Sequence, residues 1–281
     1  MDSMIIGRYL PLNSFIHKRD PRLKIGLLLL FLIAVFFDAG FIGYGILSAY
    51  VILCLLLSKI SFKDVMKAMK PMIFMMAFLA LFNLLFLQTG SVVCTLGPVK
   101  IYSGALKQTA YILIRLILII SMTTLLTACT KPLDLTLGLE KLFGPLKKVG
   151  FPTHEIAMMI SIALRFIPTL LEETQRIMKA QASRGVDFQE GTFKEKVSAI
   201  VSLIIPLFIS AFMRADDLAN AMESRNYNPE ATRTRYHQVK WDLGDTLSLI
   251  FSLIVVTGVV VLSFIPVSYT HLRAHETDQY L

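Results

Sequence analysis

Hydrophobic and polar positions alternate in long blocks over the first half of the chain and again near its end. Apolar runs cover about residues 23–37, 43–57, 71–87, 106–129 and 247–265. Each run approaches the ~20 apolar residues that cross about 30 Å of hydrocarbon. The pattern predicts an all-α integral membrane protein with about five transmembrane helices, and residues 90–107 are expected to form an external loop or hairpin.

Residues 131–240 follow a different pattern, in which apolar residues recur at helical spacing and charged residues occupy the opposite face. The segment 133–149 is amphipathic and is interrupted at Gly144 and Pro145. A long amphipathic helix is expected to begin near Thr153, and Pro168 is expected to bend it.

The run Val197–Met213 is apolar enough to cross a membrane, yet basic residues stand at both of its ends. Lys194 and Lys196 precede it, and Arg214 follows it. A transmembrane helix is expected to have more Lys and Arg on one side than on the other. We interpret this run as dipping into the membrane or lying along it, and the sequence leaves open whether it spans.

Composition and charge agree with a membrane protein. The 281 residues are 55% hydrophobic and 17% charged, which is too apolar for a soluble domain. The net charge of +8 is concentrated between the apolar runs, which indicates cytoplasmic loops and not nucleic-acid binding. Basic residues at 18–24 predict a cytoplasmic N-terminus, and one lysine per turn over 59–70 predicts an interfacial helix.

The motifs of common catalytic and cofactor sites are absent from the sequence. There is no P-loop, HExxH or G-x-S-x-G pattern, and the three cysteines are isolated. The acid pairs at 172–173 and 216–217 are consecutive, so their side chains point about 100° apart on a helix. We predict a non-catalytic chain with no metal and no cofactor.

Arg115 is the one clear charge inside a predicted transmembrane helix. Such a residue raises the hypothesis of a functional site. The alternative is an arginine that faces the helix bundle or a lipid headgroup, and no acidic partner is evident within the predicted spans.

Two similar short motifs occur in this region, AQASRG at 180–185 and AMESRN at 221–226. Their arginines, Arg184 and Arg225, are 41 residues apart. In each copy a helical pattern ends at Ser-Arg followed by Gly185 or Asn226, the residue types that most readily close a helix C-terminus. The alternative is that each arginine has no binding role and only interacts favourably with the helix dipole, as cations at helix C-termini commonly do. Two equivalent copies favour a paired docking device for a partner that is itself present twice.

Several segments together carry a family resemblance: GRYLP at 7–11, DPRLK at 20–24, LRFIP at 164–168, QASRG at 181–185 and ESRNY at 223–227. From about residue 4 to 265 the chain resembles the transmembrane T component of energy-coupling factor (ECF) transporters, the membrane scaffold of vitamin or metal-ion importers.

The resemblance implies about five transmembrane helices, long amphipathic cytoplasmic coupling helices and a cell membrane of prokaryotic type. It implies two ATP-binding subunits that dock on the Ser-Arg motifs, and a substrate-binding S component that contacts the coupling helices in the lipid bilayer. The docking residues carried over from the family are Ser183, Arg184, Gly185, Ser224, Arg225 and Asn226. The usual motif is Ala-Arg-Gly, so Ser183, Ser224 and Asn226 depart from it and leave open which ATPase takes which motif.

The expected organisation has five parts: a cytoplasmic segment 1–22, a four-span membrane region 23–130, a coupling region 131–240, a final span 241–266 and a tail 267–281. The tail is abruptly polar and resembles translated vector sequence fused to a truncated gene, so we attach no function to it. Two other functions stay open on the sequence: a self-sufficient secondary transporter or channel, and an integral-membrane enzyme.

Overall fold

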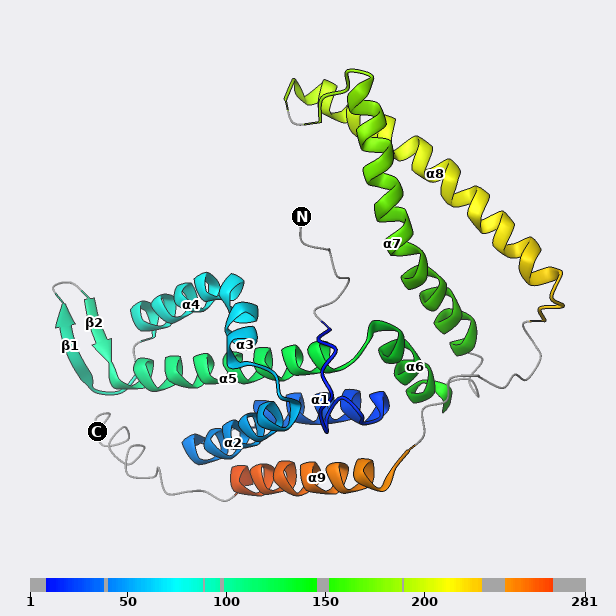
Figure 1. Cartoon of the computed structure of the whole chain (residues 1–281). Coiled ribbons are helices and arrows are strands. Elements are labelled where there is room, and N and C mark those ends of the chain that lie inside the picture. The colour runs from blue at the N-terminus through cyan, green and yellow to red at the C-terminus, as the bar shows by residue number, and fades with distance from the viewer. Residues whose placement is uncertain are drawn as a thin grey trace. The chain divides into compact units, whose positions relative to one another are not determined.

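The computed structural model (Figure 1) describes residues 9–37, 40–87, 89–96, 99–145, 152–188, 190–228 and 241–264. The chain divides into two compact units, and each is described by itself. The first unit comprises residues 1–139 and 239–281, and the second comprises residues 140–238. The tail 267–281, with its two histidines, lies outside the described residues.

The first unit is a helical bundle with one short hairpin. Its helices are α1 (Pro21–Phe36), α2 (Gly40–Ser58), α3 (Phe62–Met69), η1 (Lys70–Met72), α4 (Ile73–Phe86), α5 (Ser103–Cys129) and α9 (Leu243–Phe264). Helix α6 (Pro132–Leu142) begins in this unit and ends in the second. Strands β1 (Val92–Leu96) and β2 (Val99–Tyr102) pair antiparallel, with Val92 opposite Tyr102. For residues 90–107 the sequence had left a loop or a hairpin open, and the structure has a hairpin.

Helix α5 is the central element of the first unit (Figure 1). On one side of α5, buried residues of α1, α2 and α9 form a core that includes Phe31, Leu47 and Val259. On the other side, the amphipathic α3 and the start of α4 pack on α5 through Val65 and Met76. The lysines of α3 lie away from this contact, because hydrophobic and charged residues occupy opposite faces of that helix.

The second unit consists mainly of a helical hairpin (Figure 1). Helices α7 (Thr153–Ser183) and α8 (Phe193–Glu223) have 31 residues each, so each is about 46 Å long. Both helices continue through an internal proline, Pro168 in α7 and Pro206 in α8. A capping box at Thr192 and Glu195 starts α8, because each side chain bonds the other residue's backbone N–H.

Five helical runs in the described part of the chain are long and apolar enough to cross a membrane: α2, α3–α4 (Phe62–Phe86), α5, α8 and α9. The prediction of a helical integral membrane protein with about five such helices is confirmed. The set differs in one member from the predicted spans. Helix α1 forms where a span was expected but has only 16 residues, about 24 Å, whereas α8 meets the criterion.

Candidate functional site

The C-terminus of α7 is closed by a glycine in the left-handed conformation. Gly185 has φ +86°, and its N–H donates to Ala182 O at 2.9 Å. The N–H of Val186 donates to Gln181 O at 3.1 Å. These two bonds define a Schellman motif, which places Arg184 on the last turn of the helix.

The C-terminus of α8 repeats the same closure 41 residues later. Asn226 takes the place of the glycine with φ +57°, and its N–H donates to Glu223 O at 2.8 Å. The N–H of Tyr227 donates to Met222 O at 3.0 Å. Asparagine tolerates this conformation because its short side chain bonds locally. The two arginines therefore occupy equivalent positions in equivalent backbone motifs, as the repeat in the sequence predicted.

The side chains of the two motifs divide into bonded serines and exposed arginines. Ser183 Oγ donates to Lys179 O at 3.0 Å, and Ser224 Oγ donates to Ala221 O at 3.1 Å. Both hydroxyls thus satisfy carbonyls of their own helices. Arg184 and Arg225 are exposed, and neither has an ion pair within the described ranges.

The two motifs lie at opposite ends of the α7–α8 hairpin. Helices α7 and α8 run antiparallel, because Gln181 Nε2 donates to Ser202 O near one end and Tyr227 OH contacts Met158 Sδ near the other. Arg184 therefore follows the end of α7 that is next to the start of α8, and Arg225 follows the far end of α8 (Figure 1). The length of one helix, about 46 Å, separates the two positions.

A polar contact in the middle of the hairpin joins the two helices. Glu173 of α7 pairs with Arg214 of α8 and also accepts a hydrogen bond from Ser210 Oγ at 2.6 Å. Both partners of the ion pair are partly exposed, so this pair contributes little to stability.

The hairpin leaves one broad apolar face of α8 uncovered within its own unit. Phe208, Phe212 and Met213 are each more than 60% exposed, and isoleucines over 200–209 are about half exposed. Contiguous exposed apolar surface of this kind marks a contact with another protein or with lipid.

Arg115 in the first unit finds a partner that the sequence did not reveal. Its Nε and Nη2 atoms donate to the Tyr44 hydroxyl at 3.0 and 2.7 Å, and the guanidinium lies 5.4 Å from the centre of the Phe36 ring. No carboxylate in the described part of the chain forms an ion pair with it. The arrangement fits an arginine that faces the helix bundle, which was one of the two interpretations.

The N-terminal segment (residues 9–20) is tied to the start of α9. Asp20 caps α1 by accepting from Arg22 N at 2.8 Å, and Pro21 occupies the first helical position. The N–H of Asp20 donates to Asp245 Oδ1 at 3.2 Å, and Asp245 is almost fully buried. Sequence reasoning missed Asp245. The only local signal was an acidic residue in the first turn of the last span.

Among the described residues, no group of three or more His, Cys, Asp or Glu side chains could hold a metal ion. Cys54 and Cys129 are free thiols in the bundle, while the side chain of Cys94 lies outside the described residues.

Comparison with known proteins gives consistent matches over most of the chain. Residues 12–236 match the model of the CbiQ family, described as cobalt transport protein. The chain is 46% identical over 260 residues to the energy-coupling factor transporter transmembrane protein EcfT of Bacillus subtilis (strain 168), covering 92% of this chain and 98% of that protein. It is 44% identical over 262 residues to EcfT of Lactococcus lactis subsp. cremoris, covering 93% and 98%. It is 42% identical over 265 residues to EcfT of Thermosediminibacter oceani, covering 94% and 100%.

Proposed function

Because the chain belongs to the family of energy-coupling factor transporter transmembrane proteins, we propose that it couples two ATP-binding subunits to a substrate-binding S component. As a member of this family it is a multi-pass protein of the bacterial cell membrane and a component of a transporter. In this proposal the ATP-binding subunits hydrolyse ATP, and the chain itself is not an enzyme.

Arg184 and Arg225 are the proposed contacts with the two ATP-binding subunits. The observation that carries this proposal is the pair of equivalent helix ends, each with an exposed arginine next to a left-handed residue. Arginine has a planar fork of donors that suits carboxylates in a groove. Because about 46 Å of helix separates the two positions, one groove cannot hold both, and two subunits can hold one each.

The positions of the two motifs also limit how α8 can lie relative to the membrane. If α8 crossed the membrane, Arg184 and Arg225 would lie on opposite sides of the bilayer, because they are at opposite ends of that helix. Docking of both on cytoplasmic subunits requires α8 to remain on one side. We therefore keep the interpretation that α8 lies along the membrane or dips into it, and that the N-terminus of the chain is cytoplasmic.

In the proposed mechanism, the long rigid helices α7 and α8 transmit the movement of the ATP-binding subunits to the membrane region. When the two ATP-binding subunits approach each other, the two arginine-bearing ends must move relative to one another. Helices α7 and α8 accommodate this by a shear or hinge movement. The uncovered apolar face of α8, with Phe208 and Phe212, then carries the movement to the S component, which selects the substrate. The proposed substrates are vitamins or related micronutrients.

Co-purification with the two ATP-binding subunits tests the docking proposal. The variants are Arg184→Glu, Arg225→Glu and the double variant, and Arg176→Glu on the exposed surface of α7 is the matched control. Loss of a hydrogen-bonded charge pair at an interface costs about 2–5 kcal/mol, which weakens binding about 30-fold or more. We expect each single variant to weaken complex formation, the double variant to abolish it, and Arg176→Glu to leave it unchanged.

The membrane yield and the elution volume of each variant establish that the chain still folds. Full retention of the ATP-binding subunits by the folded double variant would refute the docking role. Both arginines would then be ordinary cations at helix C-termini.

A further inference from the structure

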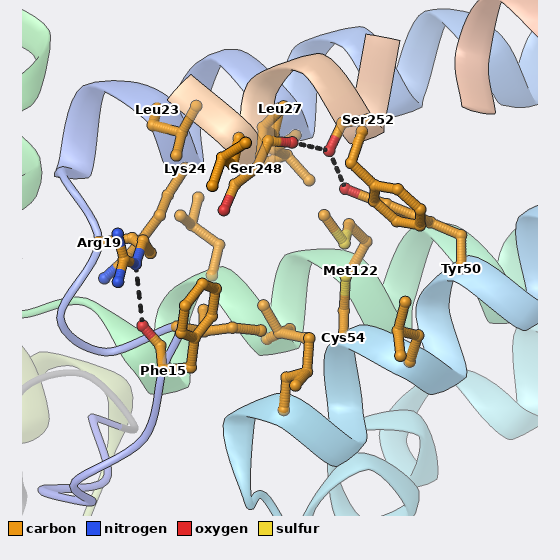
Figure 2. Close-up of a pocket in the computed structure, with 18 residues that line it drawn as sticks. Phe15, Arg19, Leu23, Lys24, Leu27, Tyr50, Cys54, Met122, Ser248 and Ser252 are labelled. Carbon is orange, nitrogen blue, oxygen red and sulfur yellow. Dashed lines mark hydrogen bonds between the residues drawn. The ribbon is translucent and has the colours of Figure 1, made fainter. Parts of the chain in front are cut away.

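The bundle of the first unit contains an apolar cavity of about 340 Å³ between α1, α2, α5, α9 and the N-terminal segment (Figure 2). Its floor consists of buried side chains that include Leu23, Met122 and Leu125. Apolar cavities of this kind do not hold ordered water, which needs several polar partners, but they do accept apolar ligands.

The polar atoms in the wall of the cavity are already bonded to one another. Tyr50 OH lies 2.8 Å from Ser252 Oγ, which donates to Ser248 O, also at 2.8 Å (Figure 2). Ser248 Oγ donates to Gly244 O at 2.7 Å. The wall therefore presents its carbon atoms to an occupant and has few hydrogen bonds to offer it.

The mouth of the cavity is ringed by exposed apolar side chains. Leu53 and Leu57 of α2 and Leu247 and Phe251 of α9 line the cavity, and each is between 38% and 68% exposed. Both helices are among those long and apolar enough to cross a membrane. An opening between two such helices, framed by leucine and phenylalanine, faces hydrocarbon and not water.

The charged side chains that line the cavity are Arg19 and Lys24, and both already have partners within the chain. Arg19 pairs with Asp242 at 3.5 Å and with Asp245 at 3.7 Å, and Lys24 Nζ donates to the carbonyl oxygens of His17 and Cys129 at 3.1 and 3.2 Å. Arg19 and Lys24 lie together at one end of the cavity (Figure 2), where α1 begins and α2 ends. From that end the cavity extends along α2 from Leu57 to Tyr50, about 10 Å along the helix axis. Cations at the end of a membrane helix lie at the level of the lipid headgroups. The cavity thus has a polar end, formed by side chains that are bonded within the chain, at the interface and an apolar end toward the middle of the bilayer.

We propose that this cavity binds one acyl chain of a membrane phospholipid, with the headgroup at the end formed by Arg19 and Lys24. The lipid comes from the leaflet on the side of the basic N-terminal segment, and its chain passes between α2 and α9 into the bundle. The site is separate from the Ser-Arg motifs, because all of its lining residues belong to the first unit.

Photolabelling of the full chain in vesicles tests the proposal. The vesicles contain phosphatidylethanolamine and a phosphatidylglycerol that carries a diazirine in its acyl chain, and adducts are mapped by mass spectrometry. Met122 and Leu125 are each 5% exposed, so lipids around the protein do not reach them. Phe78 of α4 is 57% exposed and reports on those surrounding lipids. We expect adducts at all three positions in the original sequence.

Ser248→Phe fills the cavity, while Ser263→Phe places the same side chain on α9 outside it. We expect Ser248→Phe to remove the adducts at Met122 and Leu125 and to keep the one at Phe78, and Ser263→Phe to keep all three. If Ser248→Phe fails to insert, as shown by loss of the Phe78 adduct, Cys54→Phe fills the same cavity from α2.

Absence of adducts at Met122 and Leu125 beside a labelled Phe78 would overturn the proposal, as would adducts that persist in the filled variants.

Discussion

Replacement of Gly185 by alanine is expected to open the last turn of α7. The residue has φ +86°, and a Cβ atom added to it would meet no other atom within 4 Å. The substitution therefore creates no clash, and its cost is the strain of an L-residue in the left-handed conformation. That strain is about 1–2 kcal/mol. The two hydrogen bonds that close the turn contribute about 0.5–1.5 kcal/mol each, so the strain cancels much of what holds the turn closed.

Hydrogen exchange of the amides that close the turn measures this opening. A cost of 1–2 kcal/mol raises the opening equilibrium constant about 5- to 30-fold. Exchange at position 185 and at Val186, the two donors of the closing bonds, should accelerate by that factor in Gly185→Ala. Gly185→Asn is the matched control, because Asn226 already holds the same conformation at the end of α8. Asn226→Gly, the converse change, should alter exchange there little.

Equal exchange in Gly185→Ala and Gly185→Asn would refute the reasoning, because the backbone conformation would then not limit the turn. If the docking proposal is also right, binding of an ATP-binding subunit should weaken in Gly185→Ala and stay close to the original in Gly185→Asn. Arg184 keeps its charge in both variants, so this comparison separates the geometry of the helix end from electrostatics.

Two further predictions concern the first unit. Tyr44→Phe removes both hydrogen bonds from Arg115 and should lower stability in detergent by about 1.5–3 kcal/mol, measured as a lower thermal midpoint. The control is Tyr102→Phe, which should change the midpoint little because the Tyr102 hydroxyl forms no hydrogen bond with the described residues. Burial of His17, with a smaller contribution from the Lys24 ammonium, lowers its pKa from the ordinary 6.5. The contribution of neutral His17 to the stability of the N-terminal segment is therefore complete above pH 6.5. It is lost as the pH falls through the lowered pKa. Amide protection in residues 10–20, corrected for intrinsic exchange, should decrease from pH 7.5 to 5, and the same decrease in His17→Gln would contradict this cause.

The residue pattern alone predicted the elements whose formation is local. Helices α2, α5 and α9 follow from apolar runs of sufficient length, because each helix satisfies its own backbone hydrogen bonds within the membrane. The two equivalent helix ends also follow from short signals, since Gly185 and Asn226 are residue types that favour the left-handed conformation wherever they stand. The family resemblance rested on these two helix ends and on three other short segments, at 7–11, 20–24 and 164–168.

Tertiary structure decided the contacts between residues that are distant along the chain. The bond from Asp20 to Asp245 joins positions 225 residues apart, and the partner of Arg115 is Tyr44, 71 residues away. No spacing rule in the sequence pairs such residues, because their proximity depends on how α1, α2, α5 and α9 pack. The apolar cavity of the first unit is a further product of that packing. Its lining combines Phe15 with Phe251, and only the folded bundle brings their helices and the N-terminal segment around one space.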